Sequence, residues 1–96
     1  MQEKQIEHAL VEMIQAHGGL CLKWVCPGWA GVPDRICLLP GGLIIFVELK
    51  KPGGRIAARQ EWWQDKLTAL GFVHFYVFGD FDIAALGAFI DKKLGR

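Results

Sequence analysis

The chain has 96 residues, of which 52% are hydrophobic and 22% are charged, and its formal net charge is +1. This length and apolar content exclude a disordered chain and predict one domain over residues 1–96 with a single core. A charge so close to zero gives no general attraction for nucleic acid, so any basic binding surface must be local.

Cysteine usage and the lack of a long apolar run indicate the compartment. Cys21, Cys26 and Cys37 are odd in number and lie in apolar segments, which favours reduced thiols over a disulfide framework. No run is apolar enough to span a bilayer, and the charged start MQEKQIEHAL is not typical of a signal peptide. We therefore expect a cytoplasmic protein with no membrane partner.

The first half of the chain predicts one helix and three strands. Residues 3–17 carry apolar side chains at helical spacing, and Gly18-Gly19 end that helix. Residues 20–25 are typical of a strand and precede the loop CPGWAGVP. Residues 34–39 and 43–50 are two further strands, joined by a Pro-Gly-Gly turn as a hairpin.

The second half predicts a helix, a strand and a helix. The loop KPGGRIAAR leads into a helix over about residues 57–70, which Gly71 ends. FVHFYVF is apolar on both faces, which predicts an interior strand of the sheet. Asp80 or Asp82 is expected to cap the last helix. The order αβββαβα predicts an α/β fold with a mixed central sheet flanked by helices on both faces.

Two carboxylates in the hairpin point to chemistry. Glu48 and Lys50 share one face of their strand, because alternate side chains point the same way. A three-residue loop pairs Leu39 with Leu43 and brings Asp34 opposite Glu48, whereas a two-residue loop puts them on opposite faces. Facing carboxylates repel each other unless one is protonated or a hard divalent cation lies between them. The alternative is that Asp34 only starts a strand and that Glu48 and Lys50 are solvated.

The strings around these residues resemble a nuclease family. GVPDR and FVELK resemble the PD-(D/E)xK signature, a Pro-Asp pair followed by acid-any-Lys on the next strand. The fuller pattern comprises QIEHAL, GGLCLKWVCPGWAGVPDRICLLPGG, FVELKKPGG and RQEWW. Together these strings resemble VRR-NUC, the virus-type replication-repair nuclease domain, in its small standalone phage and bacterial form. The resemblance covers most of the chain and implies a restriction-endonuclease-like core in a bacterial or phage-infected cell.

The resemblance implies phosphodiester hydrolysis with Mg²⁺ or Mn²⁺ as cofactor. Asp34 and Glu48 match the metal ligands, and the backbone carbonyl of Leu49 commonly completes such a site. Lys50 matches the lysine that orients or activates the attacking water. A cation held there would supply the activated water and stabilise charge on the phosphate.

Two further catalytic residues are implied outside the signature. Glu7 matches the glutamate of the first helix, which helps to hold the metal directly or through water. Gln60 matches the glutamine of the helix that follows the signature strand. Without the resemblance, Glu7 is an ordinary surface charge and Gln60 a buried amide that bonds to the backbone.

Basic and aromatic residues near the signature suggest contacts to DNA. The basic cluster flanks the site and fits phosphate groups, although ordinary surface charge is the alternative. Its members are Lys51, Arg55, Arg59 and, on the other face of the strand from Asp34, Arg35. Trp24 and Trp29 bracket the CPG loop and either stack on an unpaired base or pack within the protein or against a subunit.

The residues and the resemblance together predict a metal-dependent DNA endonuclease, and the resemblance implies that it is structure-selective. The resemblance implies a homodimer that cuts four-way (Holliday) junctions or related branched DNA. A two-fold protein would match the two-fold symmetry of such a junction. The alternative is a non-catalytic DNA-binding or assembly module that keeps the nuclease fold.

Overall fold

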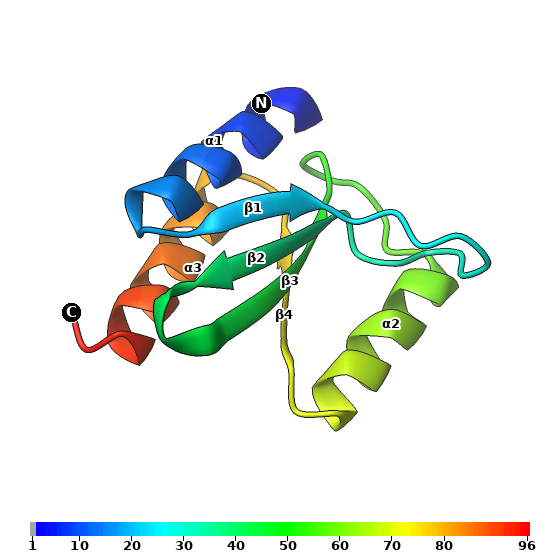
Figure 1. Ribbon diagram of the computed structural model, residues 1–96. Helices are drawn as coiled ribbons and strands as arrows, with labels where there is room; N and C mark the ends of the chain where they lie inside the picture. The colour runs from blue at the N-terminus through cyan, green and yellow to red at the C-terminus, as the bar shows by residue number, and fades with distance from the viewer. Residues whose placement is uncertain (1) are drawn as a thin grey trace.

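The computed structural model describes residues 2–96 as a sheet with helices on both faces (Figure 1). The order of elements along the chain is αβββαβα, as the sequence predicts. The elements are α1 (Glu3–Ala16), β1 (Leu20–Lys23), β2 (Arg35–Leu39), the 3-10 turn η1 (Pro40–Gly42), β3 (Leu43–Leu49), α2 (Ala58–Ala69), β4 (Val73–Val77) and α3 (Asp80–Lys93). Gly79, rather than Asp80 or Asp82, is the N-cap of α3.

The sheet is mixed, with strand order β1-β2-β3-β4. β1 pairs with β2 and β2 with β3 in antiparallel fashion, whereas β3 and β4 are parallel. The expectation that β4 is an interior strand is therefore wrong, because β4 lies at an edge of the sheet. Its apolar character has another cause: α2 packs on one of its faces and α3 on the other.

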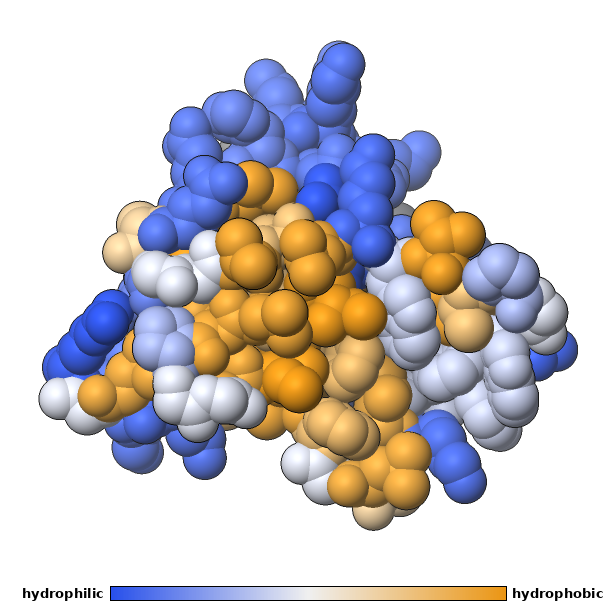
Figure 2. Space-filling view, in the orientation of Figure 1, coloured by the Kyte–Doolittle hydropathy of each residue, from blue (hydrophilic) through white to orange (hydrophobic). Residues whose placement is uncertain are grey.

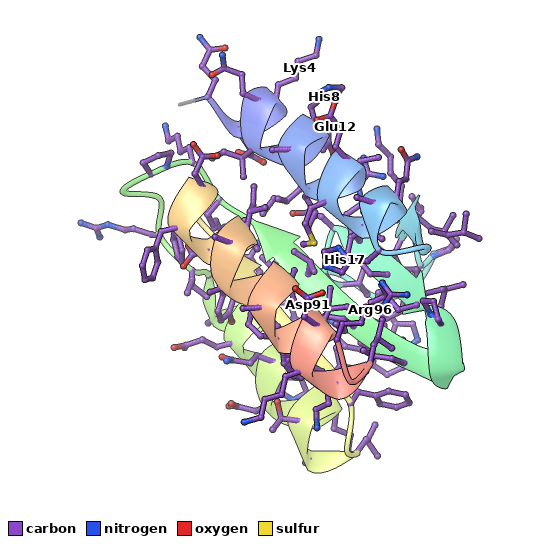
Figure 3. All side chains as sticks on the ribbon, turned by 90° about the vertical axis from the view of Figure 1, so that its left-hand side faces the viewer. Lys4, His8, Glu12, His17, Asp91 and Arg96 are labelled. Carbon is purple, nitrogen blue, oxygen red and sulfur yellow. The ribbon has the colours of Figure 1, made fainter. Side chains whose placement is uncertain are left out.

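The main core lies between the sheet and the paired helices α1 and α3. Helical spacing puts Ile6, Leu10 and Ile14 on one side of α1, where all three are fully buried. Burying a side chain of this size stabilises the fold by roughly 1.5–3 kcal/mol. Figure 3 shows α1 and α3 side by side, and His17 Nε2 lies 2.9 Å from Asp91 Oδ1 where the two helices meet.

The opposite face of the sheet is only half covered. α2 packs on β4 and reaches β3 through the hydrogen bond from Gln60 to Glu48. Three leucines on β1 and β2 remain exposed on that face: Leu20, Leu22 and Leu38. We call these three residues the open sheet face. Figure 2 shows hydrophobic side chains gathered over the same strands.

Two further sequence-based expectations concern thiols and membranes. Cys21, Cys26 and Cys37 are all free. Within residues 2–96, no helix is both long and apolar enough to cross a membrane.

Candidate active site

The hairpin register brings Asp34 and Glu48 together. Leu39 pairs with Leu43 across the three-residue turn, and the ladder continues to the pair Arg35 and Val47. The next pair outward is Asp34 and Glu48, so the structure has the register of the three-residue loop, one of the two that the sequence permits. The turn needs glycine at its second and third positions, since both have φ near +77°.

Asp34 lies just before β2 and is held by backbone groups. Its Oδ2 accepts a hydrogen bond of 2.8 Å from the Leu49 backbone N–H. Its own carbonyl accepts one of 3.0 Å from the Trp24 N–H, which continues the pairing beyond β1. The half-buried carboxylate is therefore fixed beside the end of β3 rather than solvated at a strand start.

Glu48 is a buried carboxylate, with only 4% of the residue exposed. Its Oε2 accepts a hydrogen bond of 2.8 Å from Gln60 Nε2 and lies 3.9 Å from Lys50 Nζ. Burial, and next the negative charge of Asp34, raises the pKa of Glu48 to about 7, against the opposing effect of the Lys50 ammonium. The positive charge of Lys50 therefore does not fully offset the burial of Glu48 and its repulsion by Asp34.

Gln60 is fixed from both ends of its amide. It occupies the third position of α2, where its Oε1 accepts a 2.9 Å hydrogen bond from the Ala57 N–H at the helix start. This leaves its Nε2 free to donate to Glu48. Tyr76 also reaches this turn, since its hydroxyl donates to the Gln60 carbonyl at 3.3 Å. Sequence reasoning missed Tyr76. Its place beside Glu48 depends on the parallel pairing of β3 with β4, in which Glu48 and Tyr76 are partners.

Lys50 follows β3 and stays tied to the sheet. Its backbone N–H donates to the Val77 carbonyl at 2.9 Å, which extends the ladder by one residue. Only 17% of its side chain is exposed, so its ammonium lies beside the carboxylates with little freedom. Asp34, Glu48, Lys50 and Gln60 therefore form one cluster on the α2 side of the sheet.

The structure does not bring Glu7 into this cluster. Glu7 Oε2 forms an ion pair of 2.9 Å with Arg35 Nη2. Arg35 pairs in the sheet with Val47, a core residue, so the ion pair lies on the α1 face, opposite Glu48. Among residues 2–96, no three Asp, Glu, His or Cys side chains are grouped closely enough to hold a metal ion.

Arg35 is not the surface contact to DNA that the sequence suggests. It is 8% exposed, and its Nη1 donates to the Cys21 carbonyl at 3.0 Å. A guanidinium that is already buried and paired with a carboxylate cannot reach a phosphate without breaking that pair. The other basic residues, Lys51, Arg55 and Arg59, are exposed on the loop after β3 and the first turn of α2.

The donor set of the cluster fits a hard divalent cation. Asp34 and Glu48 offer carboxylate oxygens on one face, and a cation between them would offset the repulsion that raises the pKa of Glu48. The two side chains alone are too few ligands, so a bound ion would need backbone carbonyl or water oxygens as well.

Comparison with known proteins agrees with this geometry. No family model matches the chain. The chain is 45% identical over 71 residues to "Putative nuclease p44" of Acyrthosiphon pisum secondary endosymbiont phage 1, which covers 74% of this chain and 76% of that protein. A solved VRR-NUC domain has a similar structure, with a TM-score of 0.76, 26% identity, and 98% of this chain and 95% of that chain covered. The chain belongs to the VRR-NUC family. The chain is therefore a nuclease.

Proposed function

We propose that this VRR-NUC protein is a Mg²⁺- or Mn²⁺-dependent endodeoxyribonuclease of the bacterial or phage-infected cytoplasm. The observation that carries the proposal is the pair of facing carboxylates, Asp34 and buried Glu48, with the Lys50 ammonium beside them. A non-catalytic domain would gain nothing from a carboxylate whose pKa is raised to about 7 by burial and by the charge of Asp34.

Each residue of the cluster has a distinct role in this proposal. Asp34 and Glu48, with the Leu49 carbonyl, would hold the cation, which activates a water and stabilises charge on the phosphate when bound. Gln60 fixes the rotamer of Glu48 through its 2.8 Å hydrogen bond. Lys50 carries a positive charge on the same face, where it can orient the attacking water or stabilise the phosphate. Glu7 would act at most through water, because Arg35 already holds it.

We further propose that the substrate is branched DNA, such as a four-way junction. The exposed Lys51, Arg55 and Arg59 flank the cluster and supply contacts to the sugar-phosphate backbone rather than to base edges. Contacts of this kind do not read sequence, so selectivity must come from the shape of the DNA. A sequence-specific nuclease would need recognition elements that residues 2–96 do not show.

Cleavage of matched substrates tests this proposal. With Mn²⁺ or Mg²⁺, we expect the protein to cut a labelled four-way junction faster than a linear duplex with the same arm sequence. With EDTA, we expect no cleavage. Equal rates on both substrates would support the nuclease activity and exclude the preference for junctions. Binding to the junction without cleavage in any metal would favour the alternative, a non-catalytic DNA-binding module.

A homodimer completes the proposal, and the open sheet face supports it. Leu20, Leu22 and Leu38 are between 37% and 58% exposed and form a continuous apolar surface on neighbouring strands. A second copy of the chain is the natural occupant, because the same patch on both subunits forms a two-fold interface. Such an interface would orient two active sites symmetrically toward a branched DNA.

Replacing Leu22 of the open sheet face should separate the subunits. We expect Leu22→Asp to convert the dimer to a monomer in light-scattering measurements after gel filtration, because it buries two unpaired carboxylates in the interface. Phe81→Asp is the matched control, since Phe81 is 85% exposed on α3, across the sheet. A wild-type monomer at micromolar concentration, or a Leu22→Asp dimer, would refute this interface.

A further inference from the structure

The four tryptophans of the chain gather into one continuous cluster. Trp24 packs against Phe46 of β3, with ring centroids 5.3 Å apart, and against Trp63 of α2, with centroids 5.6 Å apart. Trp29 contacts Trp63 at 5.8 Å and lies nearly parallel to Trp62 at 6.3 Å. The cluster thus runs from the sheet outward, and its outer members, Trp29 and Trp62, remain 55% and 44% exposed.

Contacts between the loop before Asp34 and α2 hold the outer rings in place. The Trp63 indole N–H donates to the Ala30 carbonyl at 2.9 Å. Gly31, at φ +75°, lies against Arg59, where an added Cβ would come within 2.2 Å of the Arg59 Cγ. Only glycine permits this close approach. The loop that carries Trp29 is therefore fixed to the first turn of α2, and the exposed rings are preorganised rather than mobile.

The free side of Trp62 faces a shallow surface pocket. Ala58, Arg59 and Trp62 line this pocket, whose volume is about 400 Å³. Ala58 lies one helical turn before Trp62, so its small side chain leaves the edge of the indole uncovered. Arg59 adds a cation beside the ring. An aromatic face next to a guanidinium matches an unpaired nucleotide, whose base stacks while its phosphate meets the charge.

The pocket lies on the same turn of α2 that supplies Gln60 to the carboxylate cluster. Arg59 immediately precedes Gln60, whose amide is bonded to Glu48. Lys51 and Arg55, both exposed, lie on the loop that joins β3 to this turn of α2. A strand that follows these positive charges from the cluster would bring a base to Trp62. An apolar protein segment would instead have to bury Arg59 without a partner, which is costly.

We propose that Trp29, Trp62 and Arg59 form a stacking platform that binds an unpaired base of a DNA single strand next to the active site. This inference rests on the proposed nuclease function, because it assigns the single-stranded part of the branched substrate to a place on the protein. The platform holds that strand by stacking and charge, without reading its sequence.

Binding in EDTA tests the platform without requiring cleavage. Fluorescence anisotropy would compare a labelled twelve-thymidine strand with a strand of equal length in which abasic residues replace the thymidines. The backbone charge is the same, so the ratio of the two affinities isolates base stacking. We expect wild type to prefer the thymidine strand about 10-fold, and Trp62→Ala to lose this preference. Arg59→Ala should weaken binding of both strands by the same factor.

Leu70→Ala is the matched control, because Leu70 is 62% exposed at the far end of the same helix and lies outside the platform. It should keep the 10-fold preference. Circular dichroism checks folding, and Trp62→Leu replaces Trp62→Ala if the latter is unfolded, because leucine restores apolar contact without a ring. A folded Trp62 variant that keeps the full preference overturns the platform, as does a wild type that binds both strands equally. Neither result bears on the proposed nuclease function, which is tested separately by cleavage of the junction with Mn²⁺.

Discussion

Replacing Lys50 by alanine is expected to lower the rate of metal-dependent DNA cleavage about 100- to 1000-fold, the usual cost of removing one preorganised charge donor from an active site. The ammonium is mostly buried and lies 3.9 Å from Glu48 Oε2, so no solvent cation can replace it in the same position. Single-turnover cleavage of a four-way junction measures the effect on the chemical step rather than on product release.

Lys50 also influences Glu48, which adds a second signature to the same variant. The ammonium opposes the rise in the pKa of Glu48, so its removal favours the protonated carboxyl further. A protonated carboxyl does not bind a divalent cation, because metal and proton compete for the same oxygens. We therefore expect the residual activity of Lys50→Ala to require a higher pH or more Mn²⁺ than wild type requires.

Lys51→Ala is the matched control for this experiment. Lys51 is the next residue and is exposed, so its loss should weaken DNA affinity, more at low salt, while the single-turnover rate at saturation stays close to wild type. Equal cleavage by wild type and Lys50→Ala would assign the activity to another lysine or to a contaminating enzyme.

The part of the site that could be predicted from sequence is the part that local rules determine. Strand alternation reduced the choice to two registers, and the three-residue turn found in the structure is the one that places Asp34 opposite Glu48, because the period of two fixes which side chains share a face. The same alternation predicted that the side chain of Lys50 lies on the same face as that of Glu48. The family resemblance supplied Gln60, whose position in the third residue of α2 explains how it reaches Glu48.

The parts that sequence reasoning missed all depend on tertiary contacts. Glu7 and Arg35 meet only because α1 packs on the face of the sheet to which the Arg35 side chain points, and no local pattern indicates which helix covers which arginine. The edge position of β4 depends on strand order, which its apolar composition does not report. Likewise, Trp63 and Ala30 are 33 residues apart, so the tryptophan cluster appears only when the loop is placed on α2.

Replacing Glu48 by glutamine is expected to stabilise the metal-free protein at neutral and alkaline pH. The pKa of Glu48 is raised from 4.5 to about 7, so the folded state retains a proton that the unfolded state has already lost. The contribution of Glu48 to stability is therefore fully present below pH 4.5, falls as the pH rises toward 7, and is lost above it. At 1.36 kcal/mol for each unit of pKa, the loss amounts to about 3 kcal/mol. Glutamine cannot ionise and keeps the size of the side chain, so this loss should disappear.

Urea denaturation in EDTA at pH 4.5 and pH 8 measures this difference. The free energy of unfolding of Glu48→Gln minus that of wild type should increase by about 3 kcal/mol between the two pH values. Glu61→Gln is the matched control, because Glu61 is an exposed carboxylate on α2 and its replacement should give no such increase. Taking the difference between variants cancels the titration of the groups that do not interact with Glu48.

Added metal should reverse the order of the two proteins. At pH 8, we expect Mn²⁺ to bind the folded wild type and to raise its free energy of unfolding in proportion to the logarithm of the ion concentration. Glu48→Gln lacks one of the two carboxylates and should gain little. Equal stabilisation of both proteins by Mn²⁺ would mean that the ion binds away from Glu48. A pH-independent difference in EDTA would mean that Glu48 ionises without cost, and the facing carboxylates would then give no reason to expect a cation between them.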